Sequence, residues 1–208
     1  DRQYTVKTDN LARRSAQTAM YHVLEAMTRW MAPILSFTAD EIWACMPKDK
    51  NGERAESVFL TLFYQDLFDL PENSEFDFAY WQTIEKVREV VSAELEKCRT
   101  AGEIGSSLDA EVTIYASEKL TQLLAQLGDE LRFVLITSSA KVLPLTNDSH
   151  AVEIDGEKMV VEAAKSTHAK CERCWHYRED VGNNEKHPDL CNRCIDNVEG
   201  AGEVRHYA

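Results

Sequence analysis

The sequence predicts a mainly α-helical chain with a small α+β unit and a compact module built around four cysteines. Three observations carry this prediction. Long stretches in the first half repeat apolar residues at the spacing of a helix. Residues 106–164 alternate apolar and polar side chains in short runs, as half-buried strands do. The cysteines at 171, 174, 191 and 194 form two Cys-x-x-Cys pairs.

The spacing of apolar residues predicts a first, amphipathic helix over residues 10–32. The apolar residues on its continuous face are Met20, Val23, Leu24, Met27 and Met31. A stripe at this spacing is typical of a helix packed into a bundle, so we expect it in the core together with Trp30 and Trp43. Pro33 should end the helix, because proline donates no backbone hydrogen bond.

A second, shorter helix is predicted from the capping-box pattern of Thr38 and Glu41, and Pro47 limits its length. A polar loop (48–57), a short apolar run (58–63) and an acidic linker follow.

Residues 78–101 predict a long helix that ends at Gly102. The apolar residues that share one face are Tyr80, Ile84, Val87, Val91, Leu95 and Cys98. In the α+β unit we expect strands at 112–114, 133–137 and 141–145, and a short helix capped by Ser117.

A hairpin is predicted around residues 155–158, since Asp-Gly between two apolar runs favours a tight turn. The expected division of the chain has four parts. They are a helical region (1–75), a connecting helix (76–105), an α+β domain (106–164) and the cysteine module (165–208).

Cys171, Cys174, Cys191 and Cys194 have the spacing that one tetrahedral zinc ion requires. Four thiolates fill the coordination sphere, so we expect one structural Zn²⁺ and no open position for chemistry. Two disulfides would use the same four residues. The isolated thiols Cys45 and Cys98 and the lack of an apolar signal segment indicate a reducing compartment instead, and a cytoplasmic location.

Histidines 168, 176 and 187 are near enough in the sequence to replace a cysteine ligand, but we expect them to pack or to face solvent. The chain begins with Asp1 rather than Met, which indicates part of a longer protein. No apolar run has the length that spans a bilayer, so we expect no membrane partner.

The net charge of −13 is unevenly distributed. Residues 1–32 contain five basic and three acidic residues, residues 33–164 contain eleven and twenty-five, and residues 165–208 contain seven and eight. The acidic middle would repel a polyanion, but the two ends would tolerate one.

Three stretches of the chain resemble a known family. Lys165–Tyr177 (KSTHAKCERCWHY), with the second cysteine pair downstream, closely resembles the C-terminal zinc finger of bacterial isoleucyl-tRNA synthetases. Ala32–Trp43 (APILSFTADEIW) is similar to the helical anticodon-binding region of class I synthetases for branched aliphatic amino acids. Glu103–Leu108 (EIGSSL) is similar to the segment after the long helix of that family.

This resemblance implies the C-terminal, tRNA-reading part of an isoleucine–tRNA ligase, acting as a monomer on the anticodon side of tRNA(Ile). The sequence contains neither the HIGH nor the KMSKS signature of the catalytic domain. We therefore expect ATP to bind outside this segment, and we assign it no catalytic residue.

Candidate RNA contacts follow from residue chemistry. Aromatic rings and guanidinium groups stack on the bases of single-stranded RNA. Trp175, Arg173 and Arg193 lie in or beside the cysteine pairs, where a metal would fix their positions. Arg13 and Arg14 on the first helix are candidate phosphate contacts.

Two alternatives stay open. The first is the finger of a DNA glycosylase of the formamidopyrimidine type, which contacts duplex DNA. The second is a zinc ribbon that binds protein and has no affinity for nucleic acid.

Overall fold

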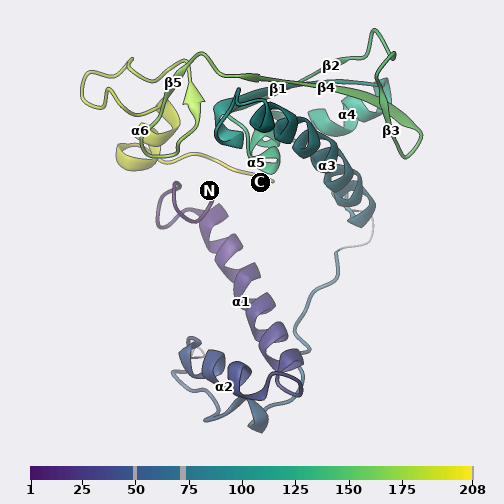
Figure 1. Ribbon diagram of the computed structural model, residues 1–208. Helices are drawn as coiled ribbons and strands as arrows, with labels where there is room; N and C mark the ends of the chain where they lie inside the picture. Colours follow the sequence, from purple (N-terminus) through teal and green to yellow (C-terminus); the bar gives the residue numbers. More distant parts are fainter. Residues whose placement is uncertain (49–50, 71–73, 208) are drawn as a thin grey trace. The chain divides into compact units, whose positions relative to one another are not determined.

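The computed structural model describes residues 1–48, 51–70 and 74–207. The chain divides into two compact units (Figure 1). Unit 1 comprises Asp1–Ala12 and Leu70–Ala208, and unit 2 comprises Arg13–Asp69. The fold is the predicted one, with helices, a small mixed sheet and four clustered cysteines. Among the described residues, no helix is both long and apolar enough to cross a lipid bilayer.

Unit 2 is helical. Its elements are α1 (Leu11–Met31, from Arg13 onward), α2 (Ser36–Cys45) and the 3₁₀ turn η1 (Val58–Leu60). A small core forms around Trp43, which is 2% exposed and packs with Ala32, Ala39 and Val58. The Trp43 indole N–H donates to the carbonyl of Ala55 at 2.8 Å, which holds the loop after α2 in place.

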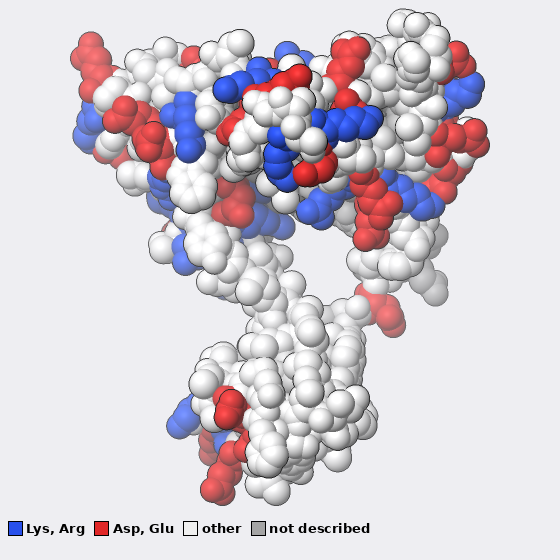
Figure 2. Space-filling view, viewed as in Figure 1, with Lys and Arg blue, Asp and Glu red and all other residues white. Residues whose placement is uncertain are grey.

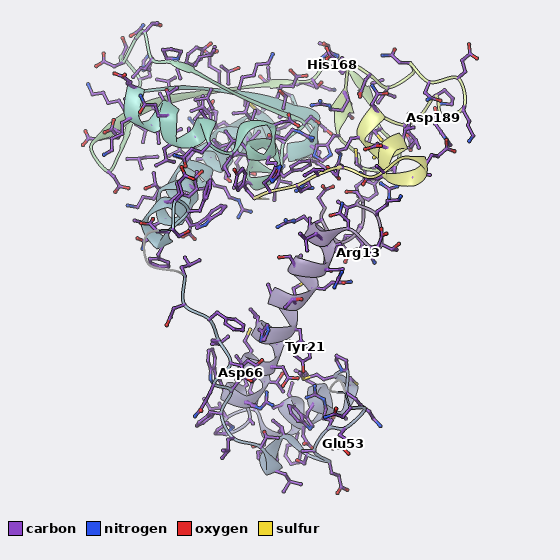
Figure 3. The ribbon with its side chains drawn as sticks, turned by 180° about the vertical axis from the view of Figure 1, so that it is seen from behind. Arg13, Tyr21, Glu53, Asp66, His168 and Asp189 are labelled. Atoms are coloured by element: carbon purple, nitrogen blue, oxygen red, sulfur yellow. The ribbon has the colours of Figure 1, made fainter. Side chains whose placement is uncertain are left out.

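A buried carboxylate, rather than the methionine stripe, occupies the inner face of α1. Glu25 is 2% exposed and accepts hydrogen bonds from Arg29 and Arg54. Both guanidinium groups also lie over the Trp43 ring, at 4.8 and 4.2 Å from its centroid. Burial and a hydrogen bond to Glu25 raise the pKa of the nearby Tyr21, which is labelled in Figure 3.

The prediction that the stripe and Trp30 form a core is wrong for most of its members. The exposed ones are Met20, Val23, Leu24, Met27 and Trp30, at 38–59%. Helical spacing shows which residues share a face, but it does not show whether anything covers that face. Figure 2 accordingly shows few charged atoms on the visible side of unit 2.

Unit 1 is built on a long helix and a sheet. Helix α3 (Phe78–Thr100) is capped by the preceding residue Asp77, whose side chain accepts a hydrogen bond from the amide of Tyr80. The helix ends before Gly102, which has φ +77°. The predicted face is confirmed, because all six of its residues are buried. They pack on strand β1 (Ala110–Ala116), whose alternate residues are also buried.

Within the described residues the main sheet has the strand order β2-β1-β4-β3. Its other strands are β2 (Ser139–Pro144), β3 (Val152–Ile154) and β4 (Glu157–Lys165). Strand β1 runs parallel to β2 and antiparallel to β4, pairing Ile114 with Val142 and Val161. The β3–β4 hairpin is confirmed, and Asp155 and Gly156 both have the positive φ that a tight turn of this kind needs.

The short helices α4 (Glu118–Ala125) and α5 (Leu131–Leu135) cover one face of this sheet (Figure 1). The 3₁₀ turns η2 (Ser107–Asp109) and η3 (Gly128–Glu130) directly precede β1 and α5. The predicted strand at 133–137 is wrong, because its first part is α5. A short apolar run does not distinguish a strand from a buried helical turn, and here Ile136 ends the helix with φ +57°.

Two predicted caps are also wrong. Helix α2 starts at Ser36, so Thr38 lies inside the helix. Ser117 precedes α4, but its hydroxyl donates to Glu157 instead of capping the helix.

The cysteine module carries β5 (Ala169–Lys170), β6 (Tyr177–Arg178) and α6 (Asn192–Glu199). The four-part division of the chain stays a prediction.

Candidate metal centre and nucleic-acid interface

The two cysteine pairs come together in unit 1. The Sγ atoms of Cys171, Cys174, Cys191 and Cys194 all lie within 4.8 Å of one another, and all four residues are buried. The first pair lies on the turn between β5 and β6. The second begins α6, where Cys191 is the residue before the helix. His168 and Asp189, shortly before each pair, mark this module in Figure 3.

Backbone hydrogen bonds shape both turns. The amide of Trp175 donates to the carbonyl of Cys171 at 2.8 Å, and the amide of Cys171 donates to the carbonyl of His176 at 2.9 Å. Across the cluster, the amide of Cys191 donates to Cys171 Sγ at 3.4 Å. These bonds orient the sulfur atoms toward a common centre.

All four thiols are free, and Cys174 Sγ lies 3.7 Å from Cys191 Sγ, far beyond the length of a disulfide bond. Hydrogen bonds among the sulfur atoms lower the pKa of Cys174, beginning with the one from Cys171. A hydrogen bond with Cys171 raises the pKa of Cys194. One divalent cation can replace the protons of four sulfur atoms packed this closely.

The donor set therefore fits one structural Zn²⁺. Four thiolates complete its tetrahedral shell and leave no coordination position for a reacting water. The nearby histidines have other contacts. His176 is buried, with Nδ1 3.1 Å from the carbonyl of Cys174 and its ring edge-to-face with Phe133. His187 pairs with Glu199 at 2.9 Å.

Trp175 follows directly after the second ligand and projects from the module. It is 60% exposed and has φ +65°, a conformation that only a few non-glycine residues adopt. Lys170 Nζ lies 5.7 Å from the centroid of its ring. The metal-binding turn thus presents a large aromatic ring to solvent with a cation beside it.

A cavity of about 580 Å³ opens next to Trp175. Its walls come from three parts of unit 1. Tyr4 belongs to the first residues of the chain, Trp175 to the cysteine module, and Leu108 and Ile136 to the α+β unit. Tyr4 is 84% and Ile136 is 47% exposed. The cavity is of the size and largely apolar character of ligand sites.

Sequence reasoning missed Tyr4 and Ile136. A tyrosine near the start of the chain carries no motif. Ile136 lies in the cavity wall only because it adopts a left-handed backbone conformation, which is rare for a β-branched residue and which the sequence does not show.

The other candidate RNA contacts lie in different settings. Arg173 and Arg193 are half-buried, and both have partners within unit 1. Arg14 is exposed on α1 and Arg13, labelled in Figure 3, is half-buried. Neither Arg13 nor Arg14 forms an ion pair within residues 1–48, 51–70 and 74–207.

Comparisons with known proteins agree with these observations. The model of the anticodon-binding domain of tRNA ligase matches residues 1–114, more than half of the chain. The zinc finger found in FPG and IleRS matches residues 170–197, which contain all four cysteines. The finger alone does not separate a synthetase from a glycosylase, whereas the first match favours the synthetase.

Curated relatives cover the whole chain. It is 56% identical over 211 residues to the isoleucine–tRNA ligase of Pseudomonas putida (strain W619). It is 54% identical over 210 residues to that of Methylococcus capsulatus and 52% identical over 209 residues to that of Pseudomonas aeruginosa (strain UCBPP-PA14). The chain spans 22% of the length of these relatives. The resemblance to isoleucyl-tRNA synthetases is thereby confirmed, and the chain belongs to the family of anticodon-binding domains of tRNA ligases.

Proposed function

We propose that this chain is the tRNA-binding part of an isoleucine–tRNA ligase. It grips the anticodon side of tRNA(Ile), while the amino acid is activated with ATP in a part of the enzyme outside these residues. The binding energy at the anticodon side positions the acceptor end of the tRNA for reaction, so that a remote contact contributes to rate as well as to affinity.

The observation that carries this proposal is the exposed Trp175 beside an apolar cavity. An anticodon loop is single-stranded, and its unstacked bases bind aromatic rings. A ring that is 60% exposed and fixed next to a metal ligand is ready to stack on such a base. Tyr4 supplies a second exposed ring on the same cavity. One stacked base contributes about 1–3 kcal/mol.

Arginine contacts form the second part of the proposal. Arg13 and Arg14 would bind backbone phosphates, which position the RNA without reading its sequence. Arg173 and Arg193 stay proposed contacts, but RNA would have to compete with the partners that each already has in unit 1. We therefore assign the larger share of the RNA affinity to Trp175.

The proposed setting is the cytoplasm, with the protein acting as a monomer and without a membrane partner. Six free cysteines support a reducing compartment. Sedimentation of the purified protein tests the monomer.

Fluorescence anisotropy of a labelled anticodon stem-loop of tRNA(Ile) tests the binding role directly. The zinc-loaded chain should bind this RNA more tightly than an acceptor-stem hairpin or an abasic DNA duplex, and its affinity should fall as salt rises. Trp175→Ala should weaken binding roughly 5- to 150-fold, the equivalent of one lost base stack.

Phe78→Ala is the matched control, because Phe78 is an aromatic residue that is 68% exposed at the start of α3 and lies away from the cavity lining. It should bind as the parent does. Equal loss in both variants would reject the role of Trp175. Preference for the abasic duplex would favour the glycosylase alternative, and the absence of any RNA affinity would favour a protein-binding ribbon.

A further inference from the structure

The first residues of the chain pack against the cysteine module, more than 160 positions away in the sequence. We call residues 1–10 the leading segment. It contains no helix or strand, yet Thr5 is 7% and Val6 is 2% exposed. A segment without regular structure that is nevertheless buried must be held by contacts to its surroundings.

Arg173 supplies the first of these contacts. It lies between the ligands Cys171 and Cys174, and its Nη1 donates to the carbonyl of Thr5. The same nitrogen is 3.7 Å from Cys194 Sγ. The guanidinium group therefore joins the leading segment to a sulfur atom of the cluster.

Arg193 supplies the second contact from the equivalent place in the other pair, between Cys191 and Cys194. Its Nη1 lies 2.9 Å from one carboxylate oxygen of Asp1, and its Nη2 lies 3.3 Å from the other. Glu203 pairs with Arg193 at 3.0 Å. The charge of Arg193 is permanent, because a guanidinium group is not deprotonated in proteins.

The chain after α6 completes the arrangement. Arg205 Nη1 is 2.7 Å from the Asp1 carboxylate. Lys7 Nζ donates to the carbonyl of Gly200 at 2.7 Å, and Asn10 Nδ2 donates to the carbonyl of Glu203 at 2.8 Å. The leading segment is thus bound along its whole length.

The position of the arginine is the same in both cysteine pairs. Both pairs read Cys-x-Arg-Cys, with the arginine directly before the second ligand. Once the metal holds the cysteines on both sides, the backbone at each arginine has little freedom, and both guanidinium groups are directed to the same segment. Tyr4 and Thr5 of that segment line the cavity beside Trp175.

We propose that Arg173 and Arg193 are positioning residues, through which the zinc-organised turns hold the leading segment and complete the wall of the cavity. This inference goes beyond the proposed RNA-binding role and does not depend on it, because every contact is within the chain. It assigns the arginines a task in the free protein, before any RNA is bound.

Hydrogen exchange of the intact, zinc-loaded chain without RNA tests this proposal. The amides of Tyr4 and Thr5 donate to the carbonyl of Asp1, and the amide of Asn10 donates to that of Lys7. In the parent protein these amides should be protected. Arg193→Ala and Arg173→Ala should each speed their exchange by about tenfold or more, as expected for the loss of a charge-assisted contact.

Zinc content and the amides of the module are measured in the same samples. Zinc should stay at one ion per chain, and Trp175 and Ile195, whose amides bond to cysteine carbonyls, should keep their protection. Lys186→Ala is the matched control. Lys186 is a cation of the same module that pairs with Glu199 instead of the leading segment, so exchange near the start of the chain should not change.

Asp1→Ala removes the carboxylate that Arg193 contacts without changing a residue of the module, in case an arginine variant loses its metal. It should speed exchange at Tyr4 and Thr5 in the same way as Arg193→Ala does. The proposal is overturned if the leading segment exchanges fast in the parent, or if its protection survives in the Arg173, Arg193 and Asp1 variants. Loss of zinc in the arginine variants with unchanged exchange in Asp1→Ala also overturns it.

Discussion

Replacing Cys191 with serine should unfold the cysteine module and release the leading segment that it holds, while helix α3 and the main sheet of unit 1 stay folded. Cys191 is 1% exposed and connects α6 to the turn of the first pair, because its backbone N–H donates a hydrogen bond to Cys171 Sγ. A serine hydroxyl is a poor zinc ligand, so the variant has three thiolates where the site needs four.

The structure gives the scale of the effect. Apart from the cysteines, the described core of the module includes only Val181 and Leu190, and both are only partly buried. Burying an aliphatic side chain completely contributes about 1.5–3 kcal/mol, so these two supply at most about 6 kcal/mol. Ordering the backbone costs about 1–2 kcal/mol for each residue, which exceeds that contribution within a few residues. Binding of structural zinc, worth about 10–16 kcal/mol in finger peptides, is the term that can compensate.

Elemental analysis and hydrogen exchange measure this outcome. Cys191→Ser should contain little zinc, and the amides of Cys171 and Trp175 should lose protection. The amides of α3 should keep theirs, because its core does not include the module. Cys45→Ser is the control, since Cys45 is an exposed free thiol. A metal-free Cys191→Ser protein with a fully protected module would show that zinc is not needed to fold it.

Two further predictions concern unit 2 and the cavity. Glu25→Gln should lower the free energy of unfolding in urea by about 1.5–3 kcal/mol, because it leaves two half-buried guanidinium groups without their charged acceptor. Burial alone would raise the pKa of Glu25, but hydrogen bonds from Arg54 and Arg29 hold it below its ordinary 4.5. Its contribution is therefore complete above about pH 4.5 and is lost as pH falls through the lower pKa of the folded state. The free energy of unfolding, measured as a function of pH, should fall over this range in the parent and not in Glu25→Gln. Ile136→Gly should change stability little or raise it by up to about 1 kcal/mol, since relief of the positive φ offsets the flexibility of glycine. Val152→Gly, a change at a similarly exposed residue of strand β3, should only lose stability in thermal unfolding, and an equal loss at Ile136 would contradict the strain argument.

Local chemistry made much of the fold and the metal site predictable. The four zinc ligands follow from spacing, because each Cys-x-x-Cys turn brings two sulfur atoms together before tertiary structure is considered. The buried face of α3 follows from the helical spacing of its apolar residues, since the sheet that it covers is formed by the part of the chain that follows it. The Asp155-Gly156 turn follows from the conformations that these two residue types adopt.

The features that sequence reasoning missed depend on distant parts of the chain. The stripe on α1 has the correct period but is exposed in the described structure. Thr5, which Arg173 contacts, is 168 positions away, and Asp1, which Arg193 contacts, is 192 positions away. The sequence pattern therefore indicated two cations without indicating that they hold the leading segment. The helical turn at 131–135 is set by packing against α3 and the sheet rather than by its own apolar run.

The proposed function requires that Trp175, held beside the zinc site, binds tRNA for a reaction that takes place outside these residues. The most direct test compares two activities of the full-length enzyme carrying Trp175→Ala. Isoleucine-dependent exchange of pyrophosphate into ATP should match that of the parent, whereas kcat/KM for charging tRNA(Ile) should fall roughly 5- to 150-fold, as for one lost base stack. Equal loss of both activities, or no loss in charging, would contradict the account.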